Sequence, residues 1–80
     1  MYKALTLLCM EAGRDLDGFA REMRRIEGVT NAYLVYGTHD DVLVEVEADT
    51  PEKLESIVKE KVRRHEYVRS TITLIAVEQV

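Results

Sequence analysis

The order in which apolar runs and helical stripes follow one another is the feature of this 80-residue chain that most limits its fold. Apolar and β-branched residues crowd four runs typical of strands, at 2–10, 29–36, 42–46 and 68–77. Between these runs, apolar residues recur every three or four positions over 16–26 and again over 54–62, which predicts two amphipathic helices. A side chain able to cap a helix precedes each stripe: Asp15 the first, and Thr50, followed by Pro51, the second. The predicted order is therefore β-α-β-β-α-β.

A six-residue segment that recurs supports this order. Arg24–Val29 (RRIEGV) returns 39 positions later as Arg63–Val68 (RRHEYV), and in both copies two arginines at a helix end lead through Glu to a strand. Two βαβ halves with right-handed crossovers interleave into a four-stranded antiparallel sheet with both helices on one face. We therefore predict an α+β, ferredoxin-like domain over residues 1–80, since a chain of this length has room for one core.

Large apolar residues remain on whichever face of the sheet the helices leave uncovered. Along three strands the alternating sets are Leu5, Leu7 and Cys9 against Ala4, Leu8 and Met10; Tyr33 and Val35 against Ala32, Leu34 and Tyr36; and Ile72, Leu74 and Ala76 against Thr73, Ile75 and Val77. Because soluble monomers rarely expose so large an apolar patch, we expect a symmetric dimer packed sheet against sheet, a dimeric α+β barrel. Glu45 and Glu47 would lie on the same uncovered side, where they need a basic partner, water or a ligand amine.

The charge balance and the single cysteine exclude several classes of protein. Fifteen acidic and eleven basic residues leave a net charge of −4, which disfavours direct nucleic-acid binding because such binding rests on neutralising phosphates. Cys9 alone can form neither an intrachain disulfide nor a thiolate metal cage. His39 beside Asp40 and Asp41 lacks the separated ligands of a transition-metal site, and no cofactor is predicted. No segment has the length of a membrane span or the pattern of a secretory leader, so we expect a cytoplasmic protein.

Four short motifs, in this order and spacing, resemble one known family. They are Gly37–Asp40 after a Val-rich strand, Val42–Val46, the helix start Thr50-Pro51-Glu52, and Val68–Thr73. Over essentially its whole length the chain resembles the RAM domain, the effector-binding and oligomerising half of the Lrp/AsnC (feast/famine) transcription regulators. It departs from the family in two places. Its first strand begins at Tyr2, which predicts a stand-alone domain without the family's N-terminal helix-turn-helix, and His39 stands where the family often has Tyr or Phe.

The resemblance implies a non-enzymatic module that binds an amino acid or a related small metabolite where subunits meet. Family domains of this kind form dimers that assemble further, commonly into octamers or similar rings, and mixed assemblies with full-length regulators are a further implication. Carried over position by position, the ligand-binding residues would be Gly37, Thr38, His39, Asp40, Ser70, Thr71 and Thr73. The chemistry is compatible, because a glycine turn offers N–H groups to a carboxylate, an aspartate suits an ammonium group, and hydroxyls complete the shell.

Other interpretations stay open at this point. Gly37–Asp40 is also an ordinary hairpin turn, and the hydroxyl residues of the last strand are common in strands for their β-propensity. The same topology occurs in dimeric α+β barrel enzymes of the monooxygenase type, for which Tyr33 and Tyr36 are the candidates, although they face opposite sides. It also occurs in ACT-type regulatory domains, whose glycine-rich turn after the first strand is matched here by Gly13 alone. His65, at the end of the second helix, is expected to cap backbone carbonyl groups.

Overall fold

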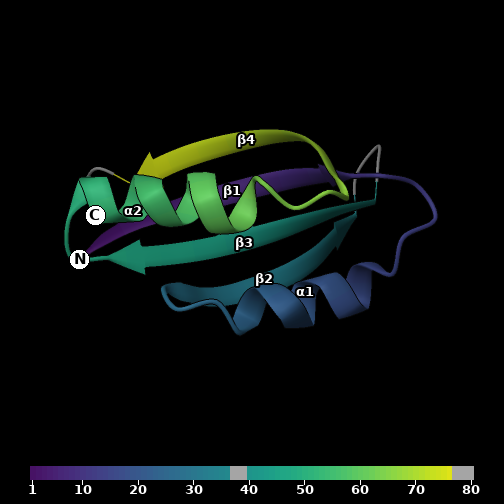
Figure 1. Ribbon diagram of the computed structural model, residues 1–80, viewed down its shortest axis with the longest axis horizontal. Coiled ribbons are helices and arrows are strands. Elements are labelled where there is room, and N and C mark those ends of the chain that lie inside the picture. The colour runs from purple at the N-terminus through teal and green to yellow at the C-terminus, as the bar shows by residue number, and fades with distance from the viewer. Residues whose placement is uncertain (37–39, 77–80) are drawn as a thin grey trace.

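A four-stranded antiparallel sheet carries two helices in the computed structural model, which describes residues 1–36 and 40–76 (Figure 1). The strands are β1 (Tyr2–Met10), β2 (Val29–Tyr36), β3 (Asp40–Ala48) and β4 (Val68–Ala76), in the spatial order β2-β3-β1-β4. The helices are α1 (Leu16–Arg24) and α2 (Pro51–Ile57), and α2 continues into a π-helical segment, η1 (Val58–Val62). The predicted ferredoxin-like order is confirmed. The expected hairpin residues 37–39 lie outside the described part, and β2 and β3 pair antiparallel on either side of them.

The core fills the space between the helices and one face of the sheet. Its largest buried side chains include Leu8 of β1, Val44 of β3, Phe19 and Met23 of α1, and Leu54 of α2. α1 packs on β2 and β3, whereas α2 packs on β3 and β1, so β4 receives the least cover. Buried residues alternate with partly exposed ones along β1 and β3. The core-facing side of β3, with Val42, Val44 and Val46, agrees with the sequence pattern, whereas the pattern does not say which side of β1 faces the core.

Both predicted helix starts are confirmed by their capping hydrogen bonds. The Asp15 carboxylate accepts a hydrogen bond from the Gly18 N–H at 3.0 Å, and the Thr50 hydroxyl accepts one from the Lys53 N–H at 3.1 Å. These bonds satisfy N–H groups that the first turn of a helix leaves without a partner. Pro51 occupies the first turn of α2, where its missing N–H is of no consequence.

The end of α1 differs from the prediction. The helix ends at Arg24, two residues before the predicted Ile26, and the chain then turns through Gly28, whose φ is +97°. The backbone angle favours glycine at this position, and a Cβ atom on Gly28 would lie 2.6 Å from Ile57 Cδ1, so the Ile57 side chain would have to turn aside. The Glu47 N–H donates to the Gly28 carbonyl at 2.8 Å and fastens this turn to β3.

The second helix widens at its C-terminal end. The Arg63 N–H donates to the Val58 carbonyl at 2.9 Å, which is the i→i+5 bond of a π-helix. Leu54, Val58 and Val62 are all buried, although steps of four residues overrun an α-helical turn of about 3.6 residues. The wider turn returns Val62 to the core, a detail that the apolar spacing does not predict. In the described part of the chain, no helix combines the length and apolar character needed to cross a membrane.

The repeated segment makes the same local turn in both copies. The Val29 N–H donates to the Ile26 carbonyl at 3.0 Å, and the Val68 N–H donates to the His65 carbonyl at 3.0 Å. Each valine is also the first residue of a strand. The repeat therefore corresponds to one kind of helix-to-strand connection, used once after α1 and once before β4.

Candidate functional site

The face of the sheet that the helices leave uncovered, called the open face below, carries a broad apolar surface. It consists of four cross-strand rows: Tyr33, Leu43, Leu7 and Ile72; Asn31, Glu45, Leu5 and Leu74; Glu47, Lys3 and Ala76; and Val35, Cys9 and Ser70. The part of the open face that β4 forms is the most accessible, since Ile72 is 62% and Leu74 63% exposed. At the opposite edge of the sheet, Tyr33 on β2 is 45% exposed. The predicted uncovered apolar face is therefore present, on the side of the sheet opposite both helices (Figure 1).

A charged group lies within the open face. Lys3 Nζ is 3.8 Å from Glu45 Oε1 and 3.6 Å from Glu47 Oε1, so the basic partner expected for these carboxylates is Lys3. The Asn31 amide donates to Glu45 Oε2 at 2.8 Å, and the Tyr33 hydroxyl donates to the same oxygen at 3.4 Å. The Glu45 side chain is only 18% exposed. Because the carboxylates of Glu45 and Glu47 share the single ammonium group of Lys3, these three side chains together carry a surplus negative charge.

Among the predicted ligand-binding residues, Asp40 and Ser70 lie at the same end of the sheet. Residues 37–39 lie outside the described part, and Asp40 is the first residue of β3. Cys9 of β1 pairs with Asp41 on one side and with Ser70 on the other. Ser70 therefore lies two strand spacings, about 10 Å, from the backbone beside Asp40.

The remaining predicted hydroxyl residues lie on the other face of the sheet. Thr71 pairs with Leu8, and Thr73 pairs with Thr6, on the side that the helices cover. Thr6 is fully buried, and its hydroxyl oxygen is 3.3 Å from that of Thr73. Because Ser70 belongs to the open face, the three hydroxyl groups do not share one face within a single chain.

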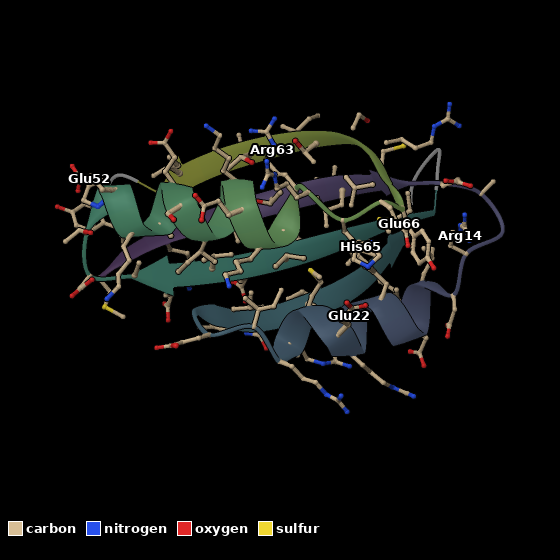
Figure 2. All side chains as sticks on the ribbon, viewed as in Figure 1. Arg14, Glu22, Glu52, Arg63, His65 and Glu66 are labelled. Carbon is tan, nitrogen blue, oxygen red and sulfur yellow. The ribbon has the colours of Figure 1, made fainter. Side chains whose placement is uncertain are left out.

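Thr73 also borders a shallow groove between the second helix and β4. The groove has a volume of about 360 Å³ and is lined by Ala4, Leu54, Glu55, Val58, Lys59, Arg63, Thr73 and Ile75. It exists because no helix packs closely on β4, which leaves Ile75 54% exposed on the helix side. Arg63, which projects from the end of the second helix in Figure 2, is one of two cationic residues that line it.

An aromatic cluster joins α1 to the segment before β4. The His65 ring meets the Phe19 ring edge-on and the Tyr67 ring at a tilt, with centroids 4.7 Å apart in both pairs. The Arg14 guanidinium lies 4.1 Å from the centroid of the Tyr67 ring, and His65 Nε2 lies 3.4 Å from the Glu22 carboxylate (Figure 2). The Tyr67 N–H donates to His65 Nδ1 at 3.2 Å. Both ring nitrogens are thus occupied, and the prediction that His65 caps helix carbonyl groups is wrong.

The described residues show little that suits catalysis or metal binding. They contain no group of three or more His, Cys, Asp or Glu side chains placed to hold a metal ion. Of the two tyrosines considered for a barrel enzyme, Tyr33 lies on the open face with its hydroxyl on Glu45, and the side chain of Tyr36 is outside the described part.

A family model matches nearly the whole chain, and several solved structures share its fold. A family model for the Lrp/AsnC ligand binding domain matches residues 3–80. The crystal structure of FFRP-DM1 is 32% identical over 96% of this chain and 100% of its own, with a TM-score of 0.82. The hypothetical protein PHS023 from Pyrococcus horikoshii is 32% identical over 99% of this chain and 93% of its own, with a TM-score of 0.85. E. coli AsnC shares the fold at 18% identity and a TM-score of 0.82, and this chain spans 52% of its length. No curated protein sequence matches the chain.

Proposed function

The chain belongs to the Lrp/AsnC family of transcription regulators, whose ligand-binding domain it matches, and we propose that it is a non-enzymatic module that binds an amino acid between subunits. The class of ligand is supported by a structure with the same fold, the Neisseria meningitidis regulator NMB0573 in complex with L-Met. Membership of a family of transcription regulators also supports a cytoplasmic location. All described elements belong to one sheet and its two helices, which supports a single ligand-binding and oligomerisation domain over residues 1–80.

The exposed apolar side chains of the open face are the observation that carries the proposal. Burial of about 500 Å² of this face in each subunit would contribute on the order of 12 kcal/mol before the cost of association. A second copy of the chain is the simplest partner, since a two-fold axis lets the same surface cover itself. We propose a sheet-to-sheet dimer, a dimeric α+β barrel, that assembles further into an octamer or a similar ring. Mixed assemblies with full-length regulators would use the same surface.

The ligand is proposed to bind at the end of the sheet where β3 begins. The loop Gly37–Asp40 precedes β3, and Ser70 lies at the same end of the open face. In a face-to-face dimer this end of one subunit meets the open face of the other, so the shell around an amino acid would combine groups from both chains. Thr71 and Thr73 lie on the covered side of β4. They would contribute to the ligand site indirectly, by helping to hold β4 in position.

The proposed assembly can be tested with two matched substitutions on β4. Ile72→Glu places a carboxylate on the open face, whereas Ile75→Glu places one at a similarly exposed position on the helix side. We expect sedimentation velocity at micromolar concentration to show dissociation for Ile72→Glu and an unchanged assembly for Ile75→Glu. A single folded chain for the unsubstituted protein under these conditions would refute the proposal.

The proposed ligand can be tested by calorimetric titration with each of the twenty amino acids. We expect Asp40→Asn to weaken the binding of the responding amino acid by about tenfold, because a charge-assisted hydrogen bond to its ammonium group is lost. Asp17→Asn on α1 removes the same charge from an exposed helix position and should leave the affinity unchanged. Absence of heat and of a thermal shift with all twenty amino acids at millimolar concentration would exclude the proposed ligand class.

A further inference from the structure

β4 lies at one edge of the sheet, and alternate residues along it turn their backbone groups outwards (Figure 1). The direction follows from one bond, in which the Glu47 N–H donates to the Gly28 carbonyl and so turns the odd-numbered residues of β3 towards β2. The even-numbered residues of β3 then face β1, and the registers make the even-numbered residues of β4 face β1 as well. The N–H and C=O groups of Thr71, Thr73 and Ile75 therefore point away from the sheet.

The opposite edge of the sheet, formed by β2, is protected. The same alternation places the Ala32 carbonyl on the outer side of β2, and the Arg24 guanidinium donates to it at 3.1 Å. α1, which carries Arg24, also packs on β2. In the described part of the chain, no side chain forms a comparable bond to the outward backbone groups of β4. The β4 edge is thus the more open of the two.

The sequence of β4 does not prevent pairing with another strand. Natural edge strands commonly carry lysine, proline or an inward-pointing charge, which keeps other chains from adding to the sheet. Residues 70–76 (STITLIA) contain no charged residue and no proline. Ile72 and Leu74 on the open face and Ile75 on the helix side are all more than half exposed. Apolar side chains therefore flank the outward backbone groups on both faces of the strand.

We propose that β4 pairs antiparallel with β4 of a second copy of the chain, about a two-fold axis at Thr73. In this register Thr73 faces the partner's Thr73 and Thr71 faces the partner's Ile75, and these residues exchange backbone hydrogen bonds. Ile72 lies opposite the partner's Leu74, where cross-strand side chains approach most closely. No like charges meet, because residues 70–76 are uncharged. Two four-stranded sheets then form one continuous sheet.

The choice of a second copy as the partner rests on the proposed function, which assembles the chain beyond a dimer. A two-fold contact between open faces ends at a dimer, so an octamer or a similar ring needs a further contact. A second two-fold contact at the β4 edge supplies it, because chains that alternate two such contacts can close into a ring. Both contacts can form on the same strand, since the edge uses backbone groups and the open face uses the side chains of Ile72 and Leu74.

Amide hydrogen exchange of the unsubstituted protein, read residue by residue by NMR, tests the pairing directly. The Ile72 and Leu74 N–H groups face β1 within the chain, whereas those of Thr71 and Thr73 gain a partner only through the edge contact. We expect Thr71 and Thr73 to exchange within about tenfold of the rates of Ile72 and Leu74. Leu34, whose N–H points outwards from β2, is the internal control and should exchange faster. Fast exchange at Thr73 beside slow exchange at Ile72 and Leu74 would overturn the inference.

A matched pair of substitutions at the proposed axis tests the contact through the mass of the assembly. Thr73→Pro removes the outward N–H, and proline is tolerated where the N–H of an edge strand faces outwards. Thr73→Val also loses the hydroxyl next to Thr6 but keeps the N–H. We expect sedimentation velocity to show the unsubstituted mass for Thr73→Val and a fall to two chains for Thr73→Pro.

Two further controls guard this comparison. Ile75→Glu should keep the edge contact, because its backbone groups remain and its carboxylate would lie in a groove that contains Lys59 and Arg63. Circular dichroism establishes that the Thr73 variants are folded. If Thr73→Pro does not fold, the exchange pattern of the unsubstituted protein decides.

The outcomes separate this inference from the proposed function. A fall of Thr73→Pro to a single folded chain would support the edge contact and count against the dimer through the open face. Equal masses for Thr73→Pro and Thr73→Val would overturn the edge contact and leave the proposed dimer standing. A mass of two chains for the unsubstituted protein, with fast exchange at Thr73, would leave the edge to a different partner and likewise overturn the inference.

Discussion

The two faces of the sheet use similar residues for different purposes. On the covered face, Leu8 and Val44 are 0% exposed and their partners are side chains of the same chain. On the open face, Leu74 and Ile72 are more than 60% exposed, and no described element packs on them. Apolar residues on the first face therefore contribute to folding, whereas those on the second can contribute only when another molecule covers them.

The sharpest way to test this contrast is the same substitution on the two faces. Leu54→Ala, on the covered side, should lower the free energy of unfolding by about 2–5 kcal/mol at every protein concentration, because it leaves a cavity in a packed core. Leu74→Ala should alter stability only through assembly, so its effect should shrink as the protein is diluted. Chemical unfolding at several concentrations measures both. Equal effects of the two changes at all concentrations would show that the open face is not an interface.

A smaller effect is expected from the polar contact between Thr6 and Thr73 on the covered face. Thr73→Val removes the hydroxyl next to buried Thr6 and should lower the free energy of unfolding by about 1 kcal/mol. Thr71→Val, two residues earlier on the same side, is the control, and the structure gives its hydroxyl no such partner among the described residues. If Thr73→Val instead changed only ligand affinity, Thr73 would act as part of the binding shell rather than as support for β4.

The smallest expected effect concerns the charge on the open face. Glu45→Gln removes the surplus negative charge and leaves Lys3 paired with Glu47, so less charge must be dehydrated when the face is covered. We expect dimerisation a few-fold tighter by sedimentation equilibrium, and no change for Glu55→Gln on the second helix. Weaker dimerisation would mean that Glu45 pairs with a cation of the partner instead.

Features that depend on local periodicity could be predicted from the sequence. The bounds Tyr2–Met10 and Val29–Tyr36 agree with the observed strands, and the N-caps at Asp15 and Thr50 were correct, because alternation and capping involve residues only a few positions apart. The apolar open face was predictable for the same reason. These are properties of one strand or one turn at a time.

Features that depend on contacts between distant segments were not predictable in the same way. The π-helical segment arises because Val58 and Val62 must both reach a core shaped by other elements. His65 contacts Phe19, 46 positions earlier in the chain, and no local pattern relates the two. The second copy of the repeat did carry a signal, since His65 and Tyr67 replace the small or aliphatic residues of the first. The loop at 37–39 remains a prediction.

The position of β1 between β3 and β4 bears on how the protein is made. One edge of β1 pairs with β3, which ends at Ala48, and the other pairs with β4, which ends at Ala76, so the second edge stays unpaired until the chain as far as Ala76 has been made. During synthesis, a segment as apolar as Tyr2–Met10 stays without its neighbours. The sheet is therefore completed only after β4 has been made, and until then the nascent chain is a natural client for chaperones that shield extended apolar peptides.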